Sequence, residues 1–235
     1  MKVYEGPRLG PEESCPYLDD RQSRHEFMLA AELKDKDWES LMRTGWRRFG
    51  LYFFRPKCTG CLECKPLRVP LPDWTPSKSQ RRILNKNKDL DFQVAPKKFN
   101  PEIFDLYQKH TRLRFPEQYN PNETHEDFWL AHYTPAMNSF QSEIYFEDKL
   151  IALGLIDPGT QGLSSSYFFF DPDLVKRSLG IYGALKEMLW AQKQNYKYYY
   201  LGYWVKGNKS MDYKAQFRPH EIYNWSLDIW EMKFD

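Results

Sequence analysis

The segment from residue 164 to residue 204 constrains the fold more than any other part of the chain. "SSSYFFF" (164–170) predicts a buried strand, and "YKYYYLGYW" (196–204) predicts a second one. Between them, "LGIYGALKEMLWAQKQ" (179–194) repeats apolar residues at the period of a helix. Two strands of one sheet joined by a crossover helix must lie parallel. We therefore expect a sheet that is parallel at this point.

The other predicted elements after residue 91 complete the layout of one large domain. Helices are expected over 101–115 and 125–133, a hairpin over 142–157, a short helix over 209–217 and one or two strands over 221–234. The resulting order, β, α, α, β, β, β, α, β, α, β, β, resembles the acyltransferase fold of the GNAT type. The resemblance implies that two central strands splay apart and admit an activated acyl group.

The loop before the crossover helix argues against one acyl donor. In GNAT enzymes this loop has a Gln/Arg-x-x-Gly-x-Gly/Ala spacing, whose backbone N–H groups hold the pyrophosphate of coenzyme A. Here the loop is "DPDLVKRSLGIYG" (171–183), which lacks that spacing. We therefore expect no coenzyme A.

Residues 1–90 are predicted to form a small mixed α/β domain ahead of the GNAT-like domain at 91–235. Strands are expected over 26–33, 46–56 and 66–71. A short helix is expected to start at Asp35 as its cap and to end at Gly45. The fold class is thus α/β, with two domains.

A second helix of this region is expected to present a basic surface. It starts after Thr75-Pro76-Ser77, because Ser77 is a good capping residue and Gln80 follows three positions later. At about 100° per residue, its basic side chains share an arc of roughly 160°. They are Lys78, Arg81, Arg82, Lys86 and Lys88.

Three cysteines stand three residues apart in "RPKCTGCLECKPLRVP" (55–70), namely Cys58, Cys61 and Cys64. Cys15 is the only other cysteine. In a reducing cytosol this usage favours metal or redox chemistry over disulfides. Spacing alone suits a zinc ion and an iron–sulfur cluster equally well, and reduced thiols that bind nothing are the remaining alternative.

The net charge of +2 conceals an asymmetry. Residues 40–88 contain twelve Lys or Arg and two acids, whereas residues 101–235 contain fourteen basic and eighteen acidic residues. A polyanion would be attracted to the first part, unless its charges form an ordinary solvated surface. The N-terminus has no apolar run, and no stretch approaches the roughly 18 apolar residues of a membrane span. We expect a soluble, cytoplasmic protein.

Several motifs occur in order along nearly the whole chain: "CPYLDDRQSRHEF", "GWRRFGLYFFRPKCTGCLECKPLRVP", "PSKSQRR", "YFFFDPD", "SLG" and "YLGYWVKGNKSMDYKAQFRPHE". They resemble the bacterial aspartate/glutamate leucyltransferases, which are relatives of the eukaryotic arginyl-tRNA–protein transferases. The resemblance implies transfer of leucine, or of arginine in some relatives, from tRNA to the N-terminal Asp or Glu of a protein, which marks that protein for degradation. It also implies an iron–sulfur cluster on cysteines of the N-terminal domain, with Cys15 and the 58–64 loop at matching positions.

Binding roles follow from the chemistry of the two substrates. Aminoacyl-tRNA is a polyanion, so we expect the basic arc at 78–88 to hold its acceptor stem by the phosphates. The acceptor protein offers a carboxylate, which arginine binds in a bidentate manner. The candidates for this contact are Arg47, Arg48 and Arg68, with pairing to local acids as the alternative.

The transfer reaction itself needs little from the protein. The nucleophile is the acceptor's α-amine, whose ordinary pKa is about 7.7–8.0, and the ester is already activated, so neither a covalent intermediate nor a cofactor is required. A donor for the oxyanion and a proton route to the leaving hydroxyl remain to be supplied. The candidates lie in the shared motifs: Asp171, Tyr182, Tyr203 and Lys214.

Three other functions are compatible with parts of the sequence. These are arginyl transfer to the same acceptors, an aminoacyl transferase of the cell-wall type, and a non-catalytic metal-knuckle RNA-binding protein. The last is disfavoured because Cys-x-x-Cys-x-x-Cys is not a zinc-knuckle spacing, and because the acyltransferase layout follows it.

Overall fold

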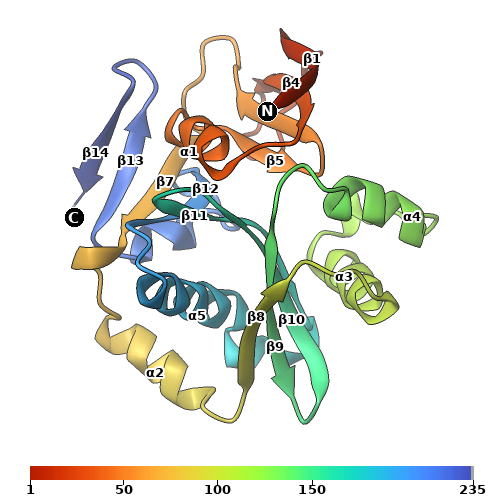
Figure 1. Cartoon of the computed structure of the whole chain (residues 1–235), viewed down its shortest axis with the longest axis vertical. Helices are drawn as coiled ribbons and strands as arrows, with labels where there is room; N and C mark the ends of the chain where they lie inside the picture. Colours follow the sequence, from red (N-terminus) through yellow and green to blue (C-terminus); the bar gives the residue numbers. More distant parts are fainter. Residues whose placement is uncertain (234–235) are drawn as a thin grey trace.

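The computed structural model describes residues 1–233 and contains a large sheet and a smaller one (Figure 1). The large sheet has the order β14 (Ile229–Lys233), β13 (His220–Asn224), β7 (Lys65–Pro70), β12 (Tyr198–Trp204), β11 (Gly162–Phe170), β10 (Lys149–Pro158), β9 (Phe140–Phe146), β8 (Asp91–Pro96). The small sheet has the order β1 (Lys2–Leu9), β4 (His25–Ala31), β6 (Tyr52–Pro56), β5 (Arg47–Phe49). Two short strands, β2 (Glu13–Ser14) and β3 (Gln22–Ser23), pair separately.

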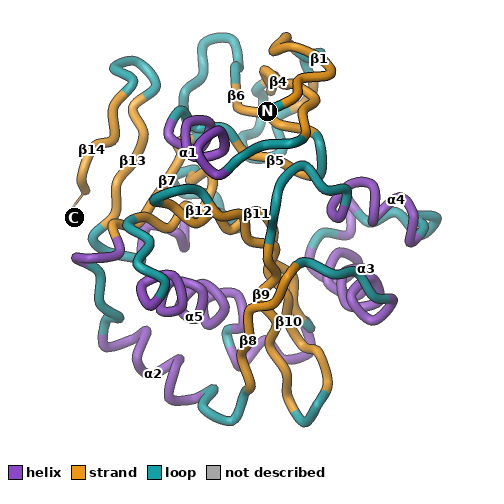
Figure 2. The backbone as a smooth tube through the Cα atoms, viewed as in Figure 1, coloured by secondary structure: helices purple, strands orange, loops and turns teal. Residues whose placement is uncertain are grey.

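Helices flank the large sheet on both sides (Figure 2). The crossover helix α5 (Leu179–Lys193) packs on β10 and β11 and is itself covered by α2 (Lys78–Lys86). On the other side lie α3 (Pro101–Arg114) and α4 (His125–Phe128), the latter continued by a π-helical turn, Trp129–Tyr133. α1 (Asp35–Arg43) packs between the small sheet and β12, where Trp38 and Met42 meet Tyr200 in one buried cluster.

The capping residues predicted for the N-terminal helices are confirmed for α2 and corrected for α1. The Ser77 hydroxyl accepts from the Gln80 N–H at 3.3 Å, and the Gln80 side chain accepts from the Ser77 N–H at 2.8 Å. In α1, Asp35 is the first helical residue rather than the cap, and Asp37 accepts from the Lys34 N–H at 3.0 Å. A carboxylate in the first turn can also accept hydrogen bonds from the free N–H groups at the start of a helix.

The expected parallel pair is present and opens into a fork. β11 and β12 pair only from Gly162 with Tyr198 to Ser164 with Tyr200. Beyond Ser164, β11 continues along β10, while β12 continues along β7. We call the space where these two strands separate the strand fork. It is the splayed geometry that the GNAT resemblance implies, and the mixed α/β fold class is confirmed.

The two halves of the chain share the large sheet. β7, from the predicted first domain, lies between β12 and β13 of the predicted second domain. Its residues Leu67 and Val69 are fully buried in the same cluster as Leu185 and Met188 of α5. A division of the chain at residue 90 therefore does not separate two cores. No helix within residues 1–233 has the length and hydrophobicity needed to cross a membrane.

Candidate functional site

Arg47 occupies the strand fork. Its Nη1 donates to Ser164 Oγ at 2.7 Å, and its Nη2 donates to the carbonyl oxygens of Ser165 and Ser166. Gly202, with φ +80°, makes room for it, since a Cβ there would lie 3.2 Å from the Arg47 Cζ. All three hydrogen-bond partners are neutral, so a largely buried cation sits at the fork without a carboxylate bonded to it. Burial lowers its pKa.

Lys214 approaches the same place from the short helix Asp212–Gln216. Its Nζ donates to the carbonyl oxygen of Tyr203 at 2.6 Å and lies 3.2 Å from Met211 Sδ. Burial and the positive charge of Arg47 lower the pKa of Lys214 to about 7. A substantial share of this amine is therefore neutral at physiological pH, and it can accept a proton there.

Tyr203 serves this site through its backbone rather than its phenol. The hydroxyl is buried and donates to the carbonyl oxygens of Gly45, at 2.9 Å, and Phe54, at 3.3 Å. Burial raises the pKa of Tyr203 well above its ordinary value, so the phenol stays protonated. Through its hydroxyl, Tyr203 thus links β12 to β6 of the small sheet by a hydrogen bond.

The other two candidates for catalysis lie among different neighbours. Asp171 caps the short helix Pro172–Arg177 by accepting from the Asp173 N–H at 3.0 Å, and it pairs with Lys109 Nζ at 2.6 Å. Tyr182 packs in a buried cluster with Leu179 and Ile144. Among the four candidates, only Tyr203 and Lys214 share a contact, and catalytic roles for Asp171 and Tyr182 gain no support from their surroundings.

Arg48 and Arg68 are each paired with a carboxylate inside the protein. Arg48 pairs with Asp157, both side chains being 3% exposed, and donates to Gly50 O at 2.8 Å. Arg68 Nε donates to Glu221 at 2.5 Å, and its guanidinium lies 3.8 Å from the centre of the Tyr198 ring. Pairing with local acids is the alternative that the sequence left open for these residues. Their predicted contact with an acceptor carboxylate is therefore not favoured by the structure.

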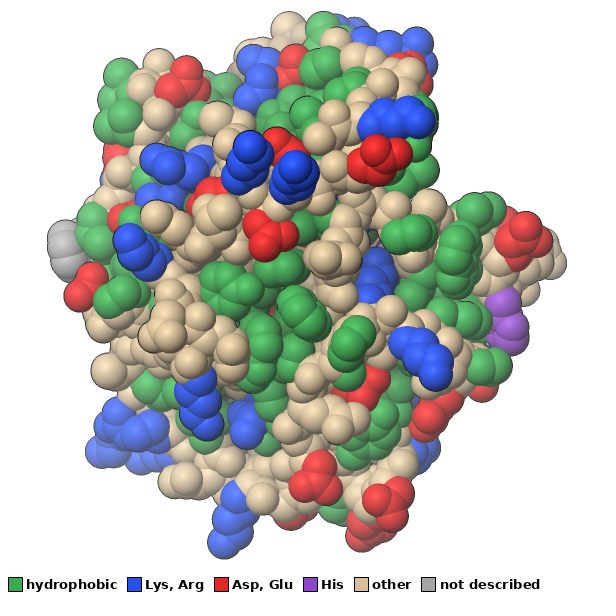
Figure 3. Space-filling model, in the orientation of Figure 1, with side chains coloured by type: hydrophobic (Ala, Val, Ile, Leu, Met, Phe, Trp, Pro, Cys, Tyr) green, Lys and Arg blue, Asp and Glu red, His purple; other side chains and the backbone are tan. Residues whose placement is uncertain are grey.

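The five basic residues of the α2 region are all exposed: Lys78, Arg81, Arg82, Lys86 and Lys88. Within residues 1–233, none of them forms an ion pair with an acid; Arg81 and Lys86 donate only to the carbonyl oxygens of Pro76 and Lys176. Lys and Arg side chains gather where Figure 1 places this helix (Figure 3). This surface can bind an anion without breaking an internal pair.

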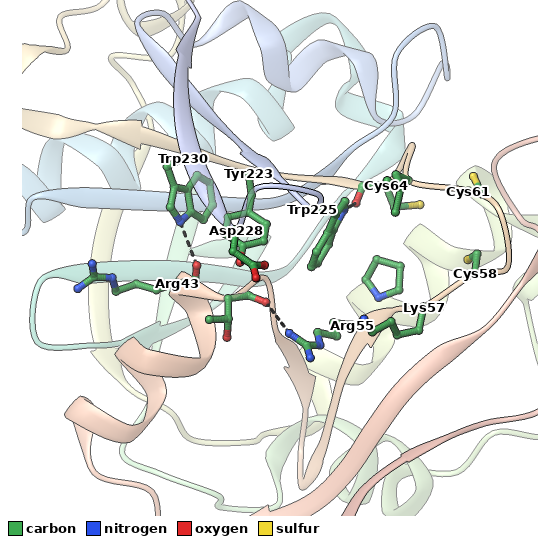
Figure 4. A pocket seen from close by; sticks show the side chains of 13 residues that line it. Arg43, Arg55, Lys57, Cys58, Cys61, Cys64, Tyr223, Trp225, Asp228 and Trp230 are labelled. Carbon is green, nitrogen blue, oxygen red and sulfur yellow. Dashed lines mark hydrogen bonds between the residues drawn. The ribbon is translucent and has the colours of Figure 1, made fainter.

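A cleft of about 680 Å³ opens between the cysteine loop and the β13–β14 hairpin (Figure 4). It is lined by Arg43, Thr44, Arg55, Pro56, Lys57, Cys58, Cys61, Leu62, Cys64, Tyr223, Trp225, Asp228 and Trp230. Two indoles of the hairpin form hydrogen bonds with the rest of the protein at the cleft. Trp225 Nε1 donates to Cys64 O, and Trp230 Nε1 donates to Arg43 O, each at 3.0 Å. Sequence reasoning missed this cleft, whose one local signal was the cluster of cations beside the cysteines.

The four cysteines lie near one another, and none is in a disulfide. Burial and the charges of Cys58, Cys15 and Cys61 raise the pKa of Cys64 to about 12. Four thiols are nevertheless the type of donor that zinc ions and iron–sulfur clusters use. In the chain from Met1 to residue 233, however, no three His, Cys, Asp or Glu side chains converge as metal ligands, so the geometry does not fit such a group.

Comparison with known proteins agrees with the motifs. The family models for the N terminus and the C terminus of arginine-tRNA-protein transferase match residues 13–82 and 102–224. An aspartate/glutamate leucyltransferase from Nitrosococcus oceani is 38% identical over 93% of this chain and 94% of its own length. One from Campylobacter jejuni is 36% identical over 94% of this chain and 93% of its own length. Among solved structures, L-PGS from Bacillus licheniformis matches with a TM-score of 0.48 and 15% identity, over 72% of this chain and 58% of that one.

Both halves of the sequence thus match one family, in order, and the two relatives align with more than nine-tenths of the chain. The chain belongs to the arginine-tRNA-protein transferase family.

Proposed function

We propose that this protein transfers leucine from Leu-tRNA to the N-terminal Asp or Glu of other proteins in the cytoplasm, and so marks them for degradation. The names of the relatives supply the leucine and the acceptors. The observation that carries the proposal for this chain is the strand fork, which holds the largely buried Arg47 guanidinium beside a lysine amine with a pKa of about 7.

The residues at the fork supply what aminoacyl transfer requires. The acceptor's α-amine attacks the ester carbonyl, forming a C–N bond, and Arg47 donates to the oxygen on which negative charge develops. Lys214, as the neutral amine, takes the proton released from the attacking nitrogen. It then gives this proton to the leaving ribose oxygen as the C–O bond breaks. The products are an amide and a free tRNA hydroxyl.

The exposed α2 region is proposed to hold the tRNA. Four of its cations lie on α2 and Lys88 lies just after it, and none of the five has an internal acid partner within the described chain. Phosphate binding by such a surface supplies affinity and orientation without reading sequence. It leaves the choice between Leu-tRNA and other aminoacyl-tRNAs to the fork and its surroundings.

A zinc ion or an iron–sulfur cluster on Cys15, Cys58, Cys61 and Cys64 stays a prediction. The proximity of the thiols supports it, whereas no three ligand side chains within residues 1–233 are placed to hold a metal. No transfer step above runs through such a group. Elemental analysis and the visible absorbance of anaerobically prepared protein test it: iron with visible bands means a cluster, and stoichiometric zinc means a tetrathiolate site.

The proposed function is tested with purified protein, radiolabelled Leu-tRNA or Arg-tRNA, and peptides that begin with Asp, Glu, Asn or Ala. We expect label from Leu-tRNA on the Asp and Glu peptides only. Label from Arg-tRNA instead would make the protein an arginyltransferase, as the name of the matching family suggests. No transfer to any peptide from either tRNA would refute the proposal.

A further inference from the structure

We propose that the cleft between the cysteine loop and the β13–β14 hairpin binds the acidic side chain of the acceptor's N-terminal residue. This inference rests on the proposed function and assigns substrate selection to a definite place. It replaces Arg47, which lies in the strand fork, and Arg48 and Arg68, which pair with internal acids, by cations that line an open cavity.

The walls of the cleft carry more positive than negative charge. Arg43, Arg55 and Lys57 face a single lining carboxylate, Asp228. Arg43 and Lys57 are exposed, and within residues 1–233 neither pairs with an acid. Asp228 already accepts the Tyr223 hydroxyl at 2.9 Å. A carboxylate entering the cleft would therefore meet unpaired cations.

Arg55 is held in place by a partner outside the cleft. Its Nε donates to Glu26 at 2.6 Å, whereas its Nη1 makes only a 3.3 Å contact with Thr44 O. The dashed line at Arg55 in Figure 4 marks this contact. An arginine fixed through Nε keeps donors for a second carboxylate, and little side-chain entropy remains to be lost on binding.

The size of the cleft indicates the end of a peptide rather than a small anion. Its volume of about 680 Å³ falls within the usual range of small-molecule sites, about 300–1,000 Å³. Leu62 and Trp225 give it apolar wall beyond the cations. These surfaces can contact the residues that follow the N-terminal Asp or Glu.

The cleft is also next to the strand fork. The Tyr203 hydroxyl bonds to Gly45 O and Phe54 O, which are the chain neighbours of the lining residues Thr44 and Arg55. The carbonyl oxygen of Tyr203 accepts a hydrogen bond from Lys214 Nζ. Tyr203 therefore lies between the cleft and the fork. One residue, Tyr203, thus separates the lining of the cleft from Lys214.

The 3′ end of the tRNA is the competing occupant, because cations beside aromatic rings also suit single-stranded nucleic acid. Two of the aromatic rings that line this cleft, however, already pack against other side chains of the protein. Trp230 is covered by the Arg68 guanidinium 4.2 Å away, and Tyr223 packs against both Trp225, at 5.1 Å, and Trp230, at 5.3 Å. Trp230 and Tyr223 therefore offer little free ring surface, and Trp225 is left as a single ring on the wall, so a base could not be held between two rings; this favours the acidic peptide.

Binding of five-residue peptides without tRNA tests the proposal by calorimetry. The wild-type protein is expected to bind a peptide starting with Asp more tightly than its Asn counterpart. Lys57→Ala should weaken binding of the Asp peptide by about fivefold, and Lys57→Glu by more, with no change for the Asn peptide. Lys149→Ala, an exposed lysine at the β9–β10 turn, is the matched control and should behave as wild type.

The same variants in the Leu-tRNA assay separate this inference from the proposed function. If wild type transfers leucine while Lys57→Glu binds the Asp peptide normally, the cleft is not the acceptor site and the function stands. If binding depends on Lys57 but no transfer occurs, the cleft assignment stands and the function fails. A CCA trinucleotide tests the competing occupant: if it displaces the peptide from wild type, and if Lys57→Glu no longer binds it, the cleft belongs to the tRNA and the proposal is overturned. Unchanged circular dichroism and thiol reactivity verify that the variants are folded.

Discussion

Lys214 is the residue whose surroundings most change its chemistry. Its ammonium form is buried with no carboxylate partner in the described chain and with Arg47 nearby, and both conditions disfavour the charge. Its pKa of about 7 therefore lies far below the ordinary lysine value of about 10.4. Below pH 7 both the folded and unfolded states bind the proton, so the cost of burying the charge is fully present. It disappears as the pH rises from about 7 to about 10.4, and stability should rise across that window.

Replacing this amine should separate activity from stability. We expect Lys214→Met to lower the transfer rate by about 10²–10⁴-fold, because the proton acceptor is gone, while thermal stability at pH 7 does not fall. The wild-type rate should increase with pH around 7. Lys214→Arg, which stays charged, should keep only the part of this dependence that comes from the acceptor's α-amine, whose pKa is about 7.7–8.0. Single-turnover rates and melting curves from about pH 6 to about pH 9 check both effects. A normal rate in Lys214→Met would exclude the assigned role.

The buried pair of Arg48 and Asp157 predicts the opposite behaviour. Burial opposes ionisation of Asp157, but Arg48, Lys97 and the hydroxyls of Ser139 and Ser166 keep its pKa below the ordinary value. Its stabilising contribution is therefore present above about pH 4 and is lost as the pH falls further. Asp157→Asn leaves the Arg48 charge uncompensated and should destabilise the protein by about 3–5 kcal/mol.

Urea unfolding at neutral pH measures this loss. Asp89→Asn breaks the exposed pair with Arg177 and is the control, since an exposed pair contributes little. Equal effects of the two substitutions would mean that the Arg48–Asp157 pair does not stabilise the core.

At the scale of elements, periodic patterns and caps were sufficient for most of the fold. The crossover helix, the strands beside it and the α2 cap followed from local rules. β1 was not predicted, because it is exposed almost throughout and carries no alternation of apolar residues. The partners of Arg48 and Arg68 were not predictable either: they lie 109 and 153 residues away, on strands whose order no local pattern determines.

The α2 region supports a prediction about salt. Arg81→Ala together with Arg82→Ala should weaken tRNA binding and reduce the slope of log affinity against log salt by about 1.5. Acceptor preference should not change, since neither residue lines the cleft. Arg112→Ala with Arg114→Ala, two exposed arginines of α3, is the matched control. Binding of labelled tRNA at several salt concentrations gives the slope, and an unchanged slope would exclude α2 from the tRNA contact.

At the scale of the whole molecule, the candidate site could not be predicted in full from the sequence, because residues far apart in the chain form it. The cleft joins residues 43–64 to residues 223–230, and the fork brings Arg47 to Lys214. In both, segments from the two ends of the chain meet across the large sheet. Motif spacing identified the cysteine loop and the Lys214 region separately. Their proximity depends on β7 lying between β12 and β13, which is a property of sheet order.

The position of β7 predicts that the protein unfolds as one unit. Removing residues 1–90 would take β7, a strand buried from Pro66 to Pro70, out of the large sheet. β12 and β13 would lose this partner, and the cluster around Leu67, Val69 and Met188 would be exposed. A fragment of residues 91–235 should therefore be unfolded or aggregated on its own. The full chain should show one urea transition, coincident by tryptophan fluorescence and by circular dichroism. Two separate transitions, or a folded fragment with native secondary structure, would mean that the halves are independent domains and that β7 is dispensable to the second.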